Sequence, residues 1–125
     1  MSAAAASCPF CSVEGTVLRN PLAHARYDRY PVSPGHLLII PSRHVADFFV
    51  TTVEERNAML ALADEARALL EREYHPDGYN LGINVGAAAG QTIFHVHLHV
   101  IPRYTGDVLN PRGGVRGVIP SRQDY

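Results

Sequence analysis

The sequence predicts an α+β fold built around an antiparallel sheet. Short apolar segments bounded by proline and glycine come first, one long amphipathic segment follows, and alternating segments come last. Strands that occur in runs on either side of a helix are typical of this architecture, whereas a parallel sheet alternates strands with helices. The 125 residues are 46% hydrophobic and 18% charged, which suits one domain with its own core.

Two strands are predicted in the first part of the chain. Residues 22–30 read L-A-H-A-R-Y-D-R-Y and predict a half-buried strand. Residues 36–40 read H-L-L-I-I and predict a buried strand that Pro41 closes. Between them, P-V-S-P-G at 31–35 contains the proline and glycine that fix or permit the backbone angles of a turn.

The middle of the chain predicts one long helix. Thr52 has the side chain of an N-cap, and Glu55 three residues later completes a capping box. Pro76 disfavours helical geometry in the residue before it, so we expect the helix to end near Glu73 or Tyr74. Apolar residues recur at helical spacing at Met59, Leu62, Ala63, Ala66, Leu69 and Leu70.

The last part of the chain returns to strand patterns. Y-N-L-G-I-N-V at 79–85 alternates like a strand, and G-A-A-A-G at 86–90 is a small-residue loop. H-V-H-L-H-V-I at 95–101 predicts a further strand that Pro102 closes. The residues from Thr105 onward contain G-D, N-P-R-G-G and I-P-S, and predict an irregular extension.

The row of histidines in this last strand is the strongest functional signal. Alternate side chains of a strand point to opposite faces, so His95, His97 and His99 share one face. Each buried imidazole needs hydrogen-bond partners, so three in register are poorly explained as a strand that happens to be rich in histidine. The opposite face carries Val96, Leu98 and Val100.

Two kinds of chemistry suit such a row. Neighbours such as His95 and His97 can converge on one metal ion, but positions four apart on a strand are separated by about 13 Å, so His99 would struggle to join them. A neutral imidazole is also a good nucleophile toward phosphorus, and neighbouring imidazoles can donate to phosphate oxygens and protonate a leaving group. We favour nucleophilic chemistry on a phosphate chain, with a metal-dependent hydrolase as the rival.

The cysteine pair near the start predicts a metal site. Cys8 and Cys11, with two residues between them, form half of a zinc site, and His44 and His95 would complete a Cys₂His₂ set. Four protein ligands leave no open coordination position, so this zinc is expected to be structural. A redox pair and two inert thiols are the alternatives, although a thioredoxin-like motif would need a βαβ context that the sequence lacks.

Composition excludes several function classes. The formal net charge of −1 gives no general attraction to nucleic acid or to an anionic membrane. No apolar run approaches the length of a bilayer span. The opening residues M-S-A-A-A-A-S lack the features of an export signal, so we expect a flexible tail and a cytoplasmic location.

Taken together, these motifs resemble the histidine triad (HIT) family. H-V-H-L-H-V-I matches the family signature, and three flanking segments match as well: C-P-F-C at 8–11, S-P-G-H-L-L-I-I-P-S-R-H at 33–44 and N-V-G-A-A-A-G-Q-T at 84–92. The resemblance covers a domain at 8–107, with a tail at 1–7 and an extension at 108–125. G-Q-T before the triad and P-R-Y-T-G-D after it are closer to the fragile-histidine-triad branch than to the Hint branch.

The resemblance implies both fold and activity. The fold would be HIT-like, a mainly antiparallel five-stranded sheet with one long helix and a short second helix or turn. Family members hydrolyse or transfer nucleotides linked through an α-phosphate, such as dinucleoside polyphosphates or nucleoside phosphoramidates, and usually work as homodimers. A purine nucleotide, adenine-containing, is therefore the expected substrate, and AMP the expected product.

The resemblance also implies roles for single residues. His97 would attack the α-phosphorus and form a nucleotidyl-histidine, His99 would contact the phosphate and the leaving group, and His95 would bind zinc. A nucleotide-binding protein with little turnover is the alternative, and the presence of the middle histidine favours an enzyme. The implied substrate contacts are Asp28 to the ribose hydroxyls, His36 beside the triad, Asn84, Gln91 and Thr92 near the phosphate, and Phe10 at the base. Purely structural roles stay open for Asp28, Asn84 and Phe10.

Overall fold

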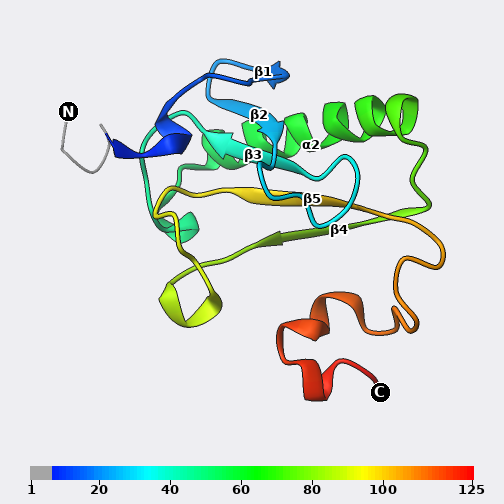
Figure 1. The fold of residues 1–125 in the computed structure, drawn as a ribbon. Helices are drawn as coiled ribbons and strands as arrows, with labels where there is room; N and C mark the ends of the chain where they lie inside the picture. The colour runs from blue at the N-terminus through cyan, green and yellow to red at the C-terminus, as the bar shows by residue number, and fades with distance from the viewer. Residues whose placement is uncertain (1–6) are drawn as a thin grey trace.

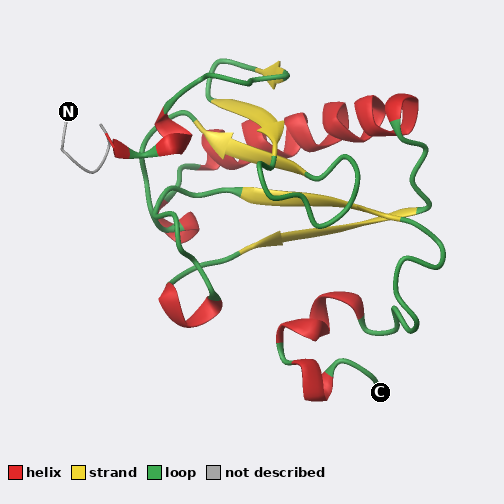
Figure 2. Ribbon diagram, viewed as in Figure 1, coloured by secondary structure: helices red, strands yellow, loops and turns green. Residues whose placement is uncertain are grey.

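A computed structural model describes residues 7–125, and it has the predicted α+β architecture (Figures 1 and 2). A five-stranded antiparallel sheet in the order β1-β2-β3-β5-β4 packs with one long helix, α2 (Val53–Glu73). The predicted flexible tail at 1–7 lies, but for its last residue, outside the described residues. The strands are β1 (Leu18–Arg19), β2 (Ala23–Tyr27), β3 (Leu37–Pro41), β4 (Gly78–Ile83) and β5 (Leu98–Arg103).

Helix α2 begins and ends where the sequence predicts. The Thr52 hydroxyl accepts from the Glu55 backbone N–H at 3.0 Å, and the Glu55 carboxylate accepts from the Thr52 N–H at 2.8 Å, which is the predicted capping box. The Arg43 guanidinium, 2.9 Å from Glu55, holds the pKa of that buried carboxyl at about 2. Tyr74 is the C-cap. Within 7–125, no helix combines the length and apolar character needed to cross a membrane.

The sheet separates two apolar clusters of unequal size. The larger lies between the sheet and α2, and it contains the Val96, Leu98 and Val100 side chains together with Met59 and Leu62 of the helix. The smaller lies on the opposite face of the sheet and consists of Phe10, Leu38 and Ile40. Because side chains alternate along β5, the histidines lie on the face of this smaller cluster.

The histidine strand begins later than the sequence predicts. β5 starts at Leu98, so His95 and His97 lie in the segment that leads into it. The pairing of β3 with β5 ends at Ile39↔Leu98. Beyond this pair, the Pro41 carbonyl of β3 accepts a hydrogen bond from the His95 ring. Pro41 itself has no N–H to donate to a ladder. The predicted alternation of faces nevertheless holds through this segment, since Val96 is buried in the main core.

The extension at 108–125 folds into turns and two short 3₁₀ helices, η4 (Gly114–Val118) and η5 (Pro120–Arg122). The Arg116 guanidinium donates to the carbonyls of Arg122 and Gln123, which closes the segment on itself. η4 packs against β4, the edge strand of the sheet. The end of the chain therefore lies beside the sheet rather than apart from it. The remaining 3₁₀ helices are η1 (Pro9–Cys11), η2 (Phe48–Val50) and η3 (Ala87–Ala89).

Candidate functional site

Four histidines lie close together: His36 directly before β3, His99 on β5, and His95 and His97 in the segment before β5. The ring centres of His97 and His99 are 5.1 Å apart, and those of His99 and His36 are 5.2 Å apart. His36, His95 and His97 are buried, and His99 is half-buried. The structure thus brings the predicted triad and His36 into one continuous group.

The backbone fixes the tautomer of His97. Its Nδ1 lies 2.9 Å from the carbonyl oxygen of His95, and a carbonyl can only accept, so Nδ1 carries the proton. The lone pair of the neutral ring is therefore on Nε2. The ring packs edge-to-face on Phe10, with ring centres 4.9 Å apart, which restricts its rotation. The orientation of the His97 ring is consequently fixed, and Nε2 is the nitrogen that carries the lone pair in the neutral form.

A second hydrogen-bond chain fixes His36 and His99. The Val32 backbone N–H donates to His36 Nδ1 at 3.1 Å, so the proton of His36 lies on Nε2, which donates to His99 Nδ1 at 2.9 Å. The proton of neutral His99 must then lie on Nε2. Burial lowers the pKa of His36, while burial and then His97 and His36 lower the pKa of His99 to about 4. At neutral pH both rings are uncharged, and His99 offers a single N–H donor.

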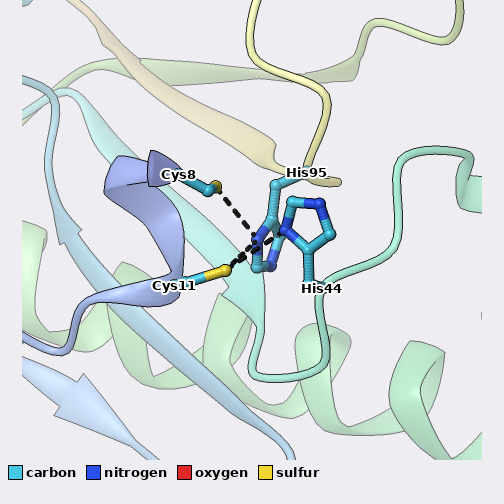
Figure 3. A group of neighbouring side chains, drawn as sticks. All are labelled: Cys8, Cys11, His44 and His95. Carbon is cyan, nitrogen blue, oxygen red and sulfur yellow. Dashed lines mark hydrogen bonds between the residues drawn. The ribbon is translucent and has the colours of Figure 1, made fainter. Parts of the chain in front are cut away.

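The two cysteines meet His44 and His95 in a compact group, which we name the Cys₂His₂ cluster (Figure 3). One ligand atom from each residue lies within 4.8 Å of the other three. His95 Nδ1 is 3.5 Å from the Cys8 sulfur and 3.6 Å from the Cys11 sulfur. His44 Nδ1 is 3.2 Å from the Cys11 sulfur. The prediction that distant segments bring these four residues together is confirmed.

The chemistry of this cluster fits zinc. His95 Nε2 donates to the Pro41 carbonyl at 2.7 Å, so the lone pair of His95 is on Nδ1, facing the thiols. A metal-binding histidine usually donates its other ring nitrogen to a carbonyl in this way. Burial and the neighbouring Cys8 raise the pKa of the Cys11 thiol, a cost that a divalent cation between the two sulfurs offsets. Two thiolates and two imidazole nitrogens are the donor set of a closed, structural zinc site.

A second group, Asp28 with His36 and His99, is equally close-packed but does not suit a cation. Its ligand atoms also lie within 4.8 Å of one another, and Asp28 Oδ2 is 3.5 Å from His36 Nε2. However, the Val32 N–H occupies the lone pair of His36 Nδ1, so Nε2 keeps its proton and has no lone pair for a metal. This group is a hydrogen-bond chain, not a metal site.

The predicted substrate contacts surround the histidines unevenly. Phe10 lies against His97, with the Arg26 guanidinium 4.7 Å from its ring centre. Asp28 is half-buried, and its Oδ1 accepts from the Tyr30 N–H. Asn84 lines a cavity of about 360 Å³ beside His99. Thr92 is exposed.

Gln91 has a structural role in this structure. Its side-chain amide donates to the carbonyls of Ala46 and Ile93, at 2.8 and 3.3 Å, and its oxygen accepts from the Gly86 N–H at 2.9 Å. Both amide hydrogens are therefore used on backbone carbonyls, and the side chain ties the 86–90 loop to the segment after β3. The predicted contact with phosphate requires that one of these bonds break.

Sequence reasoning missed several residues of this face. His24 is buried on β2 and bonds to the Phe10 backbone, while its Nδ1 has no hydrogen-bond partner among the described residues. Ile101 follows His99 at the next position on the same face and also lines the cavity. The alternation of side chains along a strand could have placed His24 and Ile101 on the histidine face. Val115 and Val118 line the cavity from η4, and no local pattern places them there.

Comparisons with known proteins identify the family of this chain. The family profile of the HIT domain matches residues 13–106. A HIT-like protein of Mycoplasma genitalium is 40% identical over 104 residues, which cover 78% of this chain and 74% of that protein. An AP-4-A phosphorylase of Mycobacterium tuberculosis is 36% identical over 96 residues, which cover 75% of this chain and 49% of that protein.

A solved structure extends the likeness to three dimensions. The crystal structure of a zinc-bound histidine triad family protein from Mycobacterium smegmatis superposes with a TM-score of 0.76 at 34% identity, covering 85% of this chain and 81% of that one. The family profile, the sequence identity and the fold all agree. This chain belongs to the histidine triad (HIT) family.

Proposed function

We propose that this protein is a nucleotide hydrolase or transferase that cleaves at an α-phosphate through a nucleotidyl intermediate on His97. The observation that carries the proposal is the 2.9 Å hydrogen bond from His97 Nδ1 to the His95 carbonyl, because it places the lone pair of the neutral form on Nε2. An imidazole in this state is a competent nucleophile at neutral pH. The relative from M. tuberculosis, named as an AP-4-A phosphorylase, supports the same class of substrate.

The reaction divides one displacement into two. In the first step, the His97 Nε2 lone pair forms a bond to the α-phosphorus, and the bond from phosphorus to the leaving group breaks with its electron pair on the leaving group. In the second step, a water oxygen attacks phosphorus, the bond to Nε2 breaks, and its electron pair returns to His97. The water gives one proton to solvent, and a nucleoside monophosphate such as AMP is released.

Other residues bind and orient the nucleotide. His99 donates its Nε2–H to a phosphate oxygen or to the departing atom, a contact that gains strength as charge develops there. Asp28 accepts from the ribose hydroxyls. Oδ1 accepts from the Tyr30 N–H and Oδ2 faces His36, and each oxygen keeps a second lone pair for a hydroxyl. Phe10 forms one wall of a purine pocket, with adenine as the expected base. Asn84 and Thr92 flank the 86–90 loop that Gln91 holds in place, and they contact the phosphate.

The Cys₂His₂ cluster would hold a structural zinc. Bound zinc would supply cross-linking rather than catalysis, because four protein ligands leave no open position. It would tie η1 to the loop after β3 and to the segment before β5, and so fix Phe10 and His95 beside His97. The zinc-bound relative from M. smegmatis supports this assignment.

Two further expectations belong to this proposal. The protein is expected to be a homodimer, and light scattering of the purified protein at several concentrations tests this. The closer likeness to the fragile-histidine-triad branch predicts a preference for dinucleoside polyphosphates, and a panel of AMP and GMP derivatives tests that preference.

The central experiment traps the intermediate. Protein mixed with α-³²P-labelled nucleotide and quenched within milliseconds should carry an acid-labile label on His97. His97→Asn should still fold and bind AMP, and should lose turnover by several orders of magnitude, as is usual when a covalent nucleophile is removed. Product formation at a normal rate without a labelled protein would show that the proposal is wrong.

A further inference from the structure

The Cys₂His₂ cluster has a property that the proposed function does not use, because its two sulfurs can bond to each other. Cys8 and Cys11 are the only two cysteines of the chain, and both are free and half-buried. Their sulfurs lie within 4.8 Å of each other and face the His95 ring (Figure 3). A disulfide bond is about 2 Å long, so rotation of the two side chains with a small backbone movement would close it.

The backbone between the cysteines already has the geometry of a short bridge. The Cys11 N–H donates to the Cys8 carbonyl at 3.2 Å, which closes the single turn of η1. Such a turn holds its first and fourth Cα atoms within about 7 Å, the upper limit for a disulfide. Pro9 and Ser12 beside the cysteines are exposed, so a small oxidant in solvent can reach the thiols.

A disulfide would remove half of the donor set. The thiolate is the form of cysteine that binds a metal, and a disulfide sulfur carries no negative charge. His44 and His95 would remain, but a structural zinc site needs four ligands. The reduced pair can therefore complete the zinc site, and the oxidised pair cannot.

The same oxidation would reach His97 by two routes. Phe10 lies between the cysteines, and its ring packs edge-to-face on His97 with ring centres 4.9 Å apart. The His95 ring faces both sulfurs, at 3.5 and 3.6 Å, and the His95 carbonyl accepts from His97 Nδ1. Two contacts that orient the His97 ring thus depend on residues held by the sulfurs.

We propose that Cys8 and Cys11 form a peroxide-sensitive switch, in which their oxidation to a disulfide releases zinc and slows the reaction at His97. The inference rests on the proposed function and names a regulation of that site. A partly exposed disulfide is readily reduced by thiols, so the switch is reversible.

The oxidant is a hydroperoxide, and the step balances with hydrogen peroxide. One thiolate sulfur attacks a peroxide oxygen, the O–O bond breaks, and hydroxide leaves a sulfenic acid behind. The second thiolate attacks that sulfur, the S–O bond breaks, and a second hydroxide leaves as the disulfide forms. Two protons from solvent convert both hydroxides to water. The sulfurs lose two electrons, and the peroxide oxygens gain them.

The test treats the zinc-loaded protein with hydrogen peroxide and follows three quantities over time. A chromogenic chelator measures released zinc, the intact mass measures oxidation, and hydrolysis of diadenosine tetraphosphate measures kcat. We expect the release of one zinc per chain, a mass lower by two hydrogens and a roughly tenfold fall in kcat, all with the same time course. Dithiothreitol with added zinc should restore kcat.

Two variants assign these changes to the cluster. The double variant Cys8→Ser/Cys11→Ser cannot form the disulfide, so peroxide should not change its residual kcat. His44→Ala keeps both thiols but lacks one ligand, so its disulfide should form faster than that of the wild type, because metal binding no longer protects the thiolates as well. Oxidation of a methionine is told apart because it adds an oxygen to the mass.

The possible failures are distinct. If zinc leaves and the disulfide forms while kcat keeps its starting value, the switch is overturned and the proposed function stands. A fall in kcat without the loss of two hydrogens, or one that dithiothreitol and zinc do not reverse, has the same meaning. Equal rates of disulfide formation in His44→Ala and the wild type also overturn the switch. If the untreated protein neither turns over a nucleotide nor labels His97, the proposed function itself fails, and the switch fails with it.

Discussion

The carbonyl oxygen of His95 lies 2.9 Å from Nδ1 of His97, and the ring of the same His95 faces two thiols. One residue therefore joins the Cys₂His₂ cluster to the proposed nucleophile His97, through its side chain on one side and its backbone on the other. Any shift of the His95 backbone changes the hydrogen bond that sets the tautomer of His97. We therefore expect the geometry of the Cys₂His₂ cluster to influence the position of the His97 ring.

This coupling predicts the effect of removing zinc. Cys11→Ser should lower the zinc content, lower the Tm and reduce kcat, because His95 loses a partner that holds its position. Elemental analysis, thermal unfolding and steady-state kinetics measure the three effects. The control is Val13→Ser, an exposed position just beyond η1. If the metal is lost while Tm and kcat both stay at wild-type values, the coupling is absent.

The hydrogen bonds from Val32 to His36 and from His36 to His99 predict which ring nitrogen of His99 carries the proton. His36→Phe keeps the site buried but removes the N–H that occupies His99 Nδ1, so the pKa of His99 should rise from about 4 toward its ordinary value. Ring ¹⁵N chemical shifts should also show the Nδ1–H tautomer. His36→Gln retains an amide donor and should keep both properties closer to wild type. If the pKa of His99 is the same in His36→Phe as in the wild type, the hydrogen bond from His36 does not control the protonation of His99.

The buried histidines predict a loss of stability in mild acid. The pKa of His99 is lowered to about 4 in the folded protein, while the unfolded value is about 6.5, so the unfolded state binds the proton first as the pH falls. The free energy of unfolding should therefore be highest above pH 6.5 and should decrease between 6.5 and 4. His36, whose pKa burial also lowers, acts in the same direction.

Urea unfolding at pH 7, 6 and 5 measures this decrease above the range in which most carboxylates titrate. His99→Gln removes one of the titrating groups, so its free energy of unfolding should depend less steeply on pH over the same interval. A wild-type stability that is constant or rises toward pH 5 would be inconsistent with neutral, buried imidazoles.

A substitution in the N-terminal capping box of α2 should change the stability of the protein without changing its activity. Glu55 is 4% exposed and accepts from both the Thr52 N–H and Arg43. Glu55→Gln removes the ion pair while keeping the shape, and should cost about 1–3 kcal/mol in the free energy of unfolding. Chemical denaturation checks this, with the exposed Glu54→Gln as the control. The kcat of the folded fraction should not change, since the cap lies apart from the triad.

Local signals in the sequence were sufficient for much of this molecule. The capping box at Thr52 and the proline after the helix gave its ends correctly, because caps and breakers act within a few residues. The grouping of Cys8 and Cys11 with His44 and His95 was also predictable. Two cysteines separated by two residues are typical of half a zinc site, which needs two further ligands.

Long-range packing accounts for what the sequence did not reveal. β5 starts late because the Pro41 carbonyl, from another strand, bonds to the His95 ring. The hydrogen bonds of Gln91 to Ala46 and Gly86 join segments that no periodicity relates. The position of η4 beside β4 is likewise a tertiary contact. No local sequence pattern indicates that Val115 and Val118 of η4 line the cavity beside His99.

Phe10 stands between the two cysteines in the three-residue helix η1, and its ring faces His97. The residue proposed to form the wall of the base pocket and the two cysteines of the Cys₂His₂ cluster therefore belong to one short segment of chain. Substitutions that adapt the pocket to another base must preserve the geometry of this segment, and those that weaken the segment also loosen the pocket. If both proposals hold, we expect substitutions at Phe10 to change base preference and metal retention together.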